Sequence, residues 1–417
     1  MTLIAATQER PAIAPVVRQD KPVSPPETLP AWTYNNAEFF ALERERLLLA
    51  NWQMVCHQSE VREIGSYATL DFMGERALVV RGEDGQIRAF HNVCRHRAAA
   101  VARGQYGRCD GALRCFYHGW TYGLDGKLKA VPGERNFPGL DKAEYGLRTL
   151  PIEIWSGFVF VKFRDGGPSV AERLAPYATE LAQYRLDEME PRSDPYFVEI
   201  PVDWKNVMDN FLEGYHVPVG HPGLYRLFGT NYELDVKPGD VSRAVAQLRD
   251  RLSANWSERH YQRLLPDLDY LSQERRRAWT FYALLPNFAF DIYPDQIDFF
   301  HIVPLGPGRC ALRGRAYQVA GLPQDLERRL KACRYLGWRV NWPVLREDNM
   351  LVESVQRGLE SSGYEVGVLS EKEVCVRQLH DQVRRHLPVA RLRRAPEPGT
   401  IAMTNDVLLE IPAPASR

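Results

Sequence analysis

Two short stretches, Cys94-Arg-His96 and Cys115-Phe-Tyr-His118, decide how this chain is organised. Each stretch supplies one thiolate and one imidazole, and residues 97–114 between them are few enough for two neighbouring loops to bring both stretches together. Two sulfur and two nitrogen donors suit zinc or an iron–sulfur cluster. The sequence therefore predicts a metal centre held by these two loops.

The spacing of the four donors narrows the kind of metal centre. Two cysteines and two histidines arranged as C-x-H and C-x2-H match the ligands of a Rieske [2Fe–2S] centre, in which histidines replace cysteines on one iron. We expect Cys94 and Cys115 to bind one iron, and His96 and His118 to bind the other. A structural zinc ribbon is the alternative, although zinc sites more often use paired CxxC elements.

The residues around the second pair carry a resemblance to a known family. The segment Cys115-Phe-Tyr-His-Gly-Trp-Thr-Tyr122 resembles the second cluster loop of the Rieske-type non-haem iron oxygenases. Residues 97–114 form a slightly longer connection than is usual in that family. We expect Cys109-Asp-Gly111 to accommodate the excess in a loop.

Length, charge and cysteine usage limit the remaining possibilities. The 417 residues are enough for two domains, and the 53 basic and 53 acidic residues give no reason to expect nucleic acid or an anionic membrane as a partner. Glu9 and Arg10 follow only a brief apolar start, so neither a signal peptide nor a membrane span is predicted. The other cysteines have no regular spacing, which is typical of a reducing compartment, and we expect the cytoplasm. They are Cys56, Cys109, Cys310, Cys333 and Cys375.

Changes of pattern divide the chain into three parts. Residues 1–53 combine a proline-rich arm at 11–30 with an amphipathic helix at 36–52, which we expect to pack on the catalytic domain. Residues 54–164 show short β runs broken by turn dipeptides and predict a small antiparallel β domain. Residues 165–417 mix helices and strands and predict an α+β domain. Helices are expected at 170–186, 203–216, 242–277 and 323–359, and strands at 279–285, 288–293, 298–303 and 310–319.

A second group of metal ligands is predicted in the α+β domain. If residues 203–216 form one helix, Asp209, Glu213 and His216 lie on the same face. Pro218 is expected to end this helix and to leave His221 on a loop. Two imidazoles at a helix end suit iron, zinc or copper. The alternatives are solvated carboxylates and histidines of the core.

The third ligand is predicted from the helix at 344–359. Its apolar residues form a stripe centred on Asp348, whereas Glu347 and Glu353 lie off that stripe. Burying an ionised carboxylate is unfavourable unless it is paired or binds a metal, so Asp348 is the predicted ligand and a capping role is the alternative. With His216 and His221 it forms a 2-His-1-carboxylate triad, which leaves positions open for dioxygen on ferrous iron.

Over most of its length the chain resembles the catalytic alpha subunit of a Rieske oxygenase. The motifs are N-x6-E-x-Y-H-x4-H at 206–221 and E-D-x3-V-E-x2-Q-x-G-L at 347–359. The resemblance implies a helix-grip catalytic domain and a homotrimer in which the cluster of one subunit serves the iron of its neighbour. It also implies that Glu213 links His118 across the interface to the iron ligands. Most members of the family have aspartate at the position of Glu213. A glutamate at this position resembles the branch of the family that acts on carnitine, glycine betaine and stachydrine.

The implied enzyme is a Rieske non-haem iron monooxygenase or dioxygenase with a [2Fe–2S] cluster and mononuclear Fe(II). The implied reaction uses O2 and two electrons. No G-x-G-x-x-G motif follows a predicted strand, so a binding site for NAD(P)H is not expected in this chain. NAD(P)H is therefore expected to act only through a separate flavin or ferredoxin-type reductase. The expected reaction is oxidative N-demethylation or C–N cleavage of a small quaternary ammonium compound, with Glu213 and Asp209 as catalytic residues. The alternatives are hydroxylation of an aromatic ring or acid, and a Rieske electron-transfer protein without substrate chemistry.

Aromatic side chains could bind a trimethylammonium group through cation–π attraction. Aromatic residues in such positions more often belong to the core, so their presence is a weak indication. The candidates are Tyr225, Phe228, Tyr282, Phe290, Tyr293 and Phe299.

Overall fold

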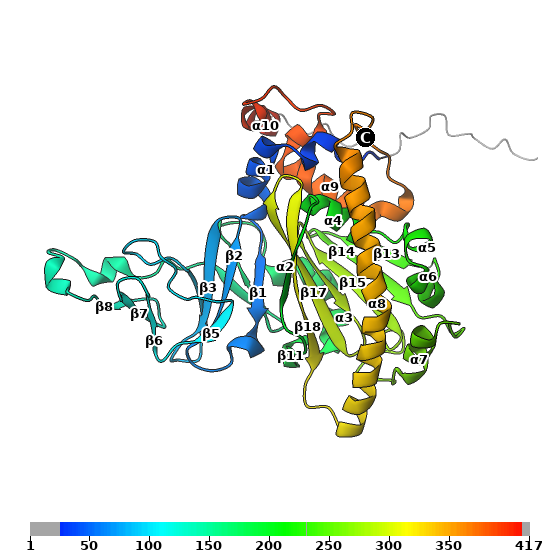
Figure 1. The fold of residues 1–417 in the computed structure, drawn as a ribbon, viewed down its shortest axis with the longest axis horizontal. Coiled ribbons are helices and arrows are strands. Elements are labelled where there is room, and N and C mark those ends of the chain that lie inside the picture. The colour runs from blue at the N-terminus through cyan, green and yellow to red at the C-terminus, as the bar shows by residue number, and fades with distance from the viewer. Residues whose placement is uncertain (1–25, 231, 411–417) are drawn as a thin grey trace, which may run out of the picture.

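The computed structural model describes residues 26–230 and 232–410, which form a small and a large lobe (Figure 1). Most of the predicted proline-rich arm lies outside the described residues. Three short antiparallel sheets build the small lobe. Tight turns connect its strands; for example, Met73 and Gly74 both have positive φ between two paired strands, as a type I′ hairpin turn requires.

The strands of the small lobe have the following bounds and order. The first sheet is β1 (Gln53–His57), β10 (Phe158–Val161) and β9 (Ile152–Trp155). The second sheet is β4 (Ile87–His91), β3 (Glu75–Arg81), β2 (Ser66–Phe72) and β5 (Tyr106–Arg108). The third sheet is β6 (Ala112–Arg114), β7 (Thr121–Gly123) and β8 (Leu128–Ala130).

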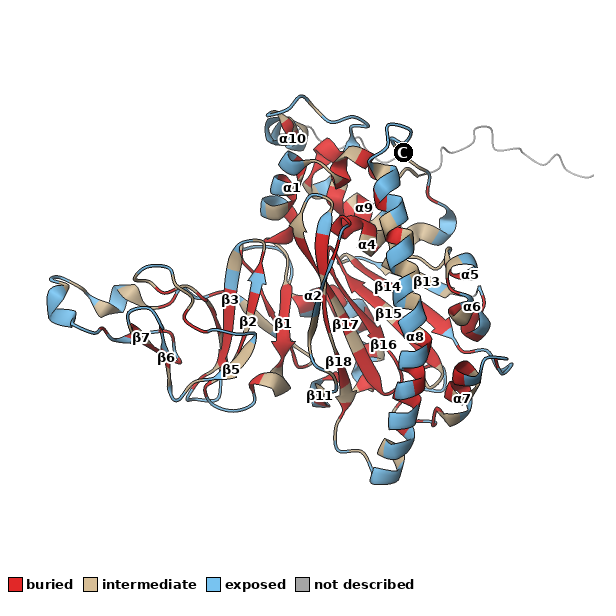
Figure 2. Ribbon diagram, viewed as in Figure 1, coloured by how far each residue is buried: buried red, intermediate tan, exposed pale blue. Residues whose placement is uncertain are grey.

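One antiparallel sheet of eight strands organises the large lobe. Its inner strands are buried along most of their length, whereas its edge strands and the outer side of the long helix α8 (Gln324–Leu359) are more exposed (Figure 2). Strand order is β11 (Met189–Pro191), β18 (Arg309–Val319), β17 (Gln296–Gly306), β16 (Phe288–Ile292), β15 (Ala278–Leu284), β14 (Val241–Gln247) and β13 (Tyr232–Lys237), and β12 (Tyr196–Ile200) also pairs with β18.

Most helices cover one face and one end of this sheet (Figure 1), while the short helices α2 (Val170–Leu174) and α3 (Ala178–Leu181) pack on the other face with the small lobe. The longest, α8 (Gln324–Leu359), crosses the sheet face and contacts α4, α5, α6 and α7. The other helices are α1 (Ala37–Glu43), α2 (Val170–Leu174), α3 (Ala178–Leu181), α4 (Trp204–Phe211), α5 (Val217–Gly220), α6 (Pro222–Phe228), α7 (Trp256–Leu264), α9 (Val374–His386) and α10 (Ile401–Glu410). No helix in the described parts of the chain is long and apolar enough to cross a membrane.

The predicted fold class is confirmed, but several predicted helices are wrong in part; the one at 170–186, for example, is divided into two short helices, Val170–Leu174 and Ala178–Leu181. Residues 242–247 belong to strand β14, and the helix predicted at 242–277 is reduced to α7. The strand was hidden by Arg243, a charged residue that is nevertheless buried, because its guanidinium pairs with Glu180 (3.1 Å) and Glu233 (3.2 Å). The N-terminal helix is also shorter than predicted: α1 passes into a π-helical turn at Arg44–Leu48.

The N-terminal segment shares a core with the large lobe. Phe39 and Leu48 are fully buried in one cluster with Trp204 of α4 and Leu379 of α9. The assignment of residues 1–53 as an arm and a helix on the catalytic domain stays a prediction. The domain boundaries proposed at 53/54 and 164/165 stay predictions.

Candidate metal centres

Two equivalent loops carry the predicted cluster ligands at the end of the small lobe. In both loops the cysteine N–H donates to the carbonyl of the residue five positions later: Cys94 to Ala99 (2.8 Å) and Cys115 to Trp120 (2.9 Å). Each loop is therefore closed on itself by local backbone bonds. The second loop lies between β6 and β7, so the hairpin fixes its position relative to the sheet.

The structure brings the four predicted cluster ligands together, with the thiols inside and the imidazoles outside. Cys94 and Cys115 are only 3% and 2% exposed, whereas His118 is exposed and its ring lies 4.5 Å from that of His96. The His96 Nδ1 atom is buried without a hydrogen-bond partner among the described residues. A buried imidazole nitrogen without a partner is what a metal ligand shows, so these residues fit a Rieske [2Fe–2S] cluster.

Sequence reasoning missed a hydrogen-bonding residue of this centre. The Tyr122 hydroxyl lies 3.3 Å from the Cys94 sulfur and accepts a bond from the Arg95 N–H (3.0 Å). Burial raises the pKa of Tyr122 well above its usual value, and its contact with Cys94 raises it further. Hydrogen bonds to cluster sulfurs tune the reduction potential, so this hydroxyl is a candidate for that role.

The predicted helix at 203–216 is wrong beyond Phe211. Helix α4 ends there, and two short helices follow, with Pro218 and Pro222 in their first turns. Proline lacks the N–H that is unpaired at a helix start, so here it begins α5 instead of ending a longer helix. His216 lies directly before α5 and His221 lies between α5 and α6.

Despite the broken helix, His216, His221 and Asp348 meet. Their three donor atoms lie within 4.8 Å of one another: the two Nε2 atoms are 3.0 Å apart, and Asp348 Oδ1 lies 2.9 Å from His221 Nε2 and 3.8 Å from His216 Nε2. Metal–ligand bonds of about 2.1 Å at right angles place neighbouring donors about 3.0 Å apart. Two of the three separations match this value and the third, 3.8 Å, is longer, so His216, His221 and Asp348 fit the ligand set of a mononuclear iron.

A carboxylate supports each of the two histidines at its other nitrogen. Glu213 hydrogen-bonds His216 Nδ1 and accepts from the His216 N–H (3.1 Å), while Glu347 Oε2 lies 2.8 Å from His221 Nδ1. Such bonds fix the ring orientation and direct Nε2 toward the metal. Burial lowers the pKa of His221, but Asp348 and Glu347 outweigh it and raise that pKa above its ordinary value.

The reasoning that excluded Glu347 needs correction. Asp348 does not lie on a buried stripe: its side chain is 26% exposed, and the supposed stripe residues Leu345 and Val355 are exposed. Neighbouring residues on a helix differ by about 100° in direction, which lets Asp348 and Glu347 approach opposite edges of the same imidazole. The sequence signal that could have identified Glu347 is its position directly before Asp348.

Further motif residues hold the helices that carry the site. The Asn206 side chain donates to the Val352 carbonyl (2.8 Å), and Gln356 Oε1 accepts from the Asp203 N–H (2.9 Å). Asn206 and Gln356 are both buried. They join α4 to α8, and so fix Asp348 relative to the chain that continues into Glu213 and His216.

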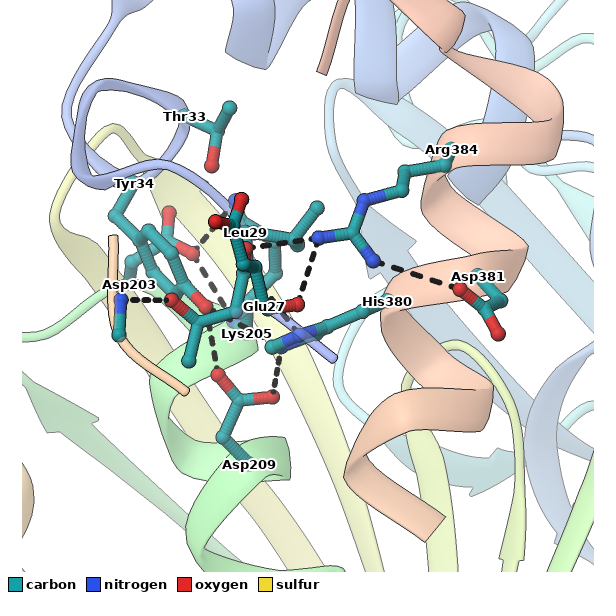
Figure 3. A network of polar contacts seen from close by, with 12 residues as sticks. Glu27, Leu29, Thr33, Tyr34, Asp203, Lys205, Asp209, His380, Asp381 and Arg384 are labelled. Atoms are coloured by element: carbon teal, nitrogen blue, oxygen red, sulfur yellow. Dashed lines mark hydrogen bonds and ion pairs between the residues drawn. The ribbon is translucent and has the colours of Figure 1, made fainter. Parts of the chain in front are cut away.

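Asp209 does not reach this site, contrary to the face it was predicted to share with His216. It lies between Tyr34 and His380 (Figure 3): Oδ2 accepts from the Tyr34 hydroxyl (2.7 Å), and Oδ1 lies 2.9 Å from His380 Nε2. His380 Nδ1 accepts from the Leu29 N–H (3.2 Å), which leaves the Nε2 proton for Asp209. These contacts join the N-terminal segment, α4 and α9.

The aromatic candidates are not brought together. Tyr282, Phe290 and Phe299 pack in a core on the sheet face that also meets Phe158 and Phe160 of the small lobe. Phe228 and Tyr293 are buried in the cluster around Trp279, and Tyr225 is partly exposed beside Arg249. Most of these aromatic side chains are part of the hydrophobic core, which was the alternative to a role in cation binding.

Within one chain the two centres lie at opposite sides of the molecule (Figure 1). The hairpin β6–β7, which carries the second cluster loop, is at the outer end of the small lobe. Helices α5 and α6, which flank His221, are beyond the far edge of the large sheet.

Comparisons with known proteins cover both lobes. Residues 51–151 match the Rieske [2Fe-2S] domain family, and residues 179–388 match the ring hydroxylating alpha subunit (catalytic domain) family. The chain is 32% identical over 373 residues to choline monooxygenase of Spinacia oleracea, covering 85% of this chain and 78% of the relative. It is 30% identical over 339 residues to the carnitine monooxygenase oxygenase subunit of Acinetobacter pittii, covering 81% of this chain and 86% of the relative.

Solved structures share the fold. The quaternary ammonium Rieske monooxygenase CntA superposes with a TM-score of 0.72 at 24% identity, over 86% of this chain and 95% of that chain. Naphthalene 1,2-dioxygenase from Rhodococcus sp. superposes with a TM-score of 0.72 at 20% identity, over 87% and 94%. Together with the family matches, these findings confirm the predicted cofactors, a Rieske cluster and a non-haem iron, and a reductase as the source of electrons. The chain belongs to the ring-hydroxylating alpha subunits and is a Rieske non-haem iron oxygenase.

Proposed function

We propose that this oxygenase acts on a small quaternary ammonium compound, by oxidative N-demethylation or another C–N cleavage. The observation that carries the proposal is the similarity to relatives named choline monooxygenase and carnitine monooxygenase over 85% and 81% of the chain. Choline and carnitine share a trimethylammonium group. Hydroxylation of an aromatic acid stays the alternative, since the naphthalene 1,2-dioxygenase likeness concerns the fold alone.

The residues of the chain would divide the work as follows. His216, His221 and Asp348 would hold the iron, while Glu213 and Glu347 would fix the two imidazoles. When bound, the iron and the cluster supply the reduction of O2 by two electrons that a reductase delivers. One oxygen atom enters a substrate C–H bond, and the other leaves as water after taking up two protons. A hydroxylated N-methyl group then separates as formaldehyde and leaves the demethylated amine.

The placement of the two centres supports transfer between subunits. Because they lie at opposite sides of one chain, we propose a homotrimer in which the cluster of one subunit approaches the iron of the next. Glu213 touches His216 and is 12% exposed, so its carboxylate could link the two centres. Asp209 would act only on the position of α4.

The test is oxygen uptake by protein loaded with both metal centres, with NADH and a surrogate reductase. Choline, carnitine, glycine betaine and benzoate are compared, and formaldehyde and product masses are measured. We expect uptake coupled to product with at least one trimethylammonium compound. Coupling with benzoate alone would instead establish the aromatic alternative, and a protein that passes electrons onward but couples no uptake would be an electron carrier.

A further inference from the structure

Two aspartates lie side by side on the large sheet, and each has one carboxyl oxygen without a hydrogen-bond partner among the described residues. Asp291 of β16 and Asp298 of β17 are direct cross-strand neighbours. Asp291 is 9% exposed, and the Oδ1 atom of each residue is buried without a hydrogen-bond partner among the described residues. Two like charges in a buried position are unfavourable unless something neutralises them.

The pair lies on the sheet face toward the iron site. Side chains alternate along a strand, so Asp291 shares its face with its cross-strand neighbour Phe281, and Asp298 shares its face with Phe300. The ring of Phe211, the last residue of α4, lies 6.4 Å from that of Phe281 and 6.2 Å from that of Phe300. The carboxylates are thus beneath the helix end from which the chain runs to His216.

The pKa values of both aspartates are raised, as expected for two neighbouring carboxyl groups in a buried position. Burial, then the charges of Asp298 and Asp348, raise the pKa of Asp291 well above its ordinary value, against a lowering contact from the Tyr293 hydroxyl. Burial raises the pKa of Asp298 to about 7, although Arg192 lowers it. Arg192 is an exposed residue, and among the described residues the buried Oδ1 atoms of Asp291 and Asp298 have no hydrogen-bond partner. The pair therefore lacks a close positive charge.

Aromatic rings lie around the two carboxyl groups. Gly314 of β18 is the cross-strand neighbour of both Phe300 and Tyr196. The Tyr196 hydroxyl occupies the space above Gly314, since a Cβ atom at that position would lie only 2.1 Å from it. The Tyr196 ring therefore lies across β18, on the same face as Asp298. Phe281, Phe300 and Tyr196 remain partly exposed on this face, so solvent reaches the rings beside the two carboxyl groups.

We propose that Asp291 and Asp298 bind the positively charged head of the substrate, and that the preferred substrate is a cation without a carboxylate, such as an amino alcohol. This inference rests on the proposed function and narrows its substrate class. Partly exposed aromatic faces beside a negative charge suit a quaternary ammonium group. A bound cation would favour the ionised form of both carboxyl groups, whereas the carboxylate of a zwitterion would lie near these two aspartates and Asp348 and would disfavour that form.

The first test is calorimetric binding to the protein loaded with both metal centres, without reductase. The probes are choline, its neutral carbon analogue 3,3-dimethyl-1-butanol, and the zwitterion glycine betaine. We expect choline to bind at least about 10-fold more tightly than either of the others. Equal affinity for choline and the neutral analogue, or tighter binding of glycine betaine, would overturn the proposal.

The second test replaces each carboxylate by its isosteric amide. Asp291→Asn and Asp298→Asn should each weaken choline binding at least about 10-fold and leave binding of the neutral analogue unchanged. Thermal unfolding should not shift downward, because a carboxyl group whose pKa is raised by burial disfavours the folded state at neutral pH, and the amide does not ionise. Asp269→Asn is the matched control, since that side chain is fully exposed. Unchanged choline affinity in both variants, or a lower unfolding midpoint in both, would contradict the proposal.

These tests are separable from the test of function, because they require no turnover. Choline binding that depends on Asp291 and Asp298 supports the cation site even if no quaternary ammonium compound supports oxygen uptake. Turnover of such a compound with unchanged binding in both variants would refute the site and leave the proposed function standing.

Discussion

Replacing Glu347 tests whether the metal site depends on a residue that is not itself a ligand. Its carboxylate lies 2.8 Å from His221 Nδ1, and the His221 side chain is only 2% exposed. The hydrogen bond is therefore shielded from water on the histidine side. The substitution leaves the three donor atoms of His216, His221 and Asp348 in place.

The expected loss follows from what each replacement keeps. Loss of a residue that orients a ligand histidine weakens metal binding about 10- to 100-fold, or about 1.4–2.7 kcal/mol. Glu347→Gln keeps an oxygen acceptor and loses the charge, so we expect the lower value. Glu347→Ala also frees the imidazole to rotate, so we expect the higher value. Asp348→Asn removes a ligand charge and should exceed both.

The measurement is titration of Fe(II) into metal-depleted mononuclear sites, with the cluster absorbance as an internal reference. Glu353→Gln is the matched control, because it removes a carboxylate from the same helix, away from the histidines. Parent affinity in Glu347→Ala would refute the orienting role. A loss in Glu347→Gln equal to that in Asp348→Asn would make Glu347 a ligand.

Three further outcomes are expected. Purified protein should contain two cluster irons and one mononuclear iron per chain, with acid-labile sulfide in the amount that the cluster requires. Cys94→Ser should remove the reddish-brown colour of the cluster. His216→Ala should keep that colour and lose activity. Glu213→Gln should keep both centres, yet a reduced cluster should fail to pass its electron within a single turnover; parent rates would exclude the link, and loss of iron would make Glu213 a ligand. Burial lowers the pKa of His57 to about 4. Below about pH 6.5 the unfolded chain therefore takes up a proton at His57, whereas the folded chain does not. The free energy of unfolding should fall by up to about 3 kcal/mol as the pH decreases from about 6.5 to about 4. His57→Gln should flatten that dependence in thermal unfolding, and an equal dependence in both proteins would contradict it.

Local spacing made much of the chain predictable. The pairs at Cys94 and Cys115 lie in loops closed by their own backbone, so short sequence separation implied proximity. The long helix was also predictable, since α8 runs from Gln324 to Leu359 as its periodicity indicated. Asp348 was identified correctly as a neighbour of both histidines, but by a burial argument that the structure does not support.

Long-range pairing explains the failures. Arg243 is polar in the sequence and buried in the structure because Glu180 and Glu233 neutralise it, so β14 showed no clear alternation. Asp209 lies on α4 as predicted, but the break after Phe211 redirects the following chain, and residues far away in sequence, Tyr34 and His380, become its partners. Periodicity along one segment carries no information about such partners.

The distance along the chain between ligands sets an order of assembly. Every residue of the cluster loops lies between Cys94 and His118, so a growing polypeptide can complete that part of its fold early and through local contacts. The iron site closes only when Asp348 joins His221, which requires the whole large sheet and α8 to be made first. During synthesis, the small lobe can thus receive its cluster while the mononuclear site does not yet exist, and iron can enter that site only after α8 has been made.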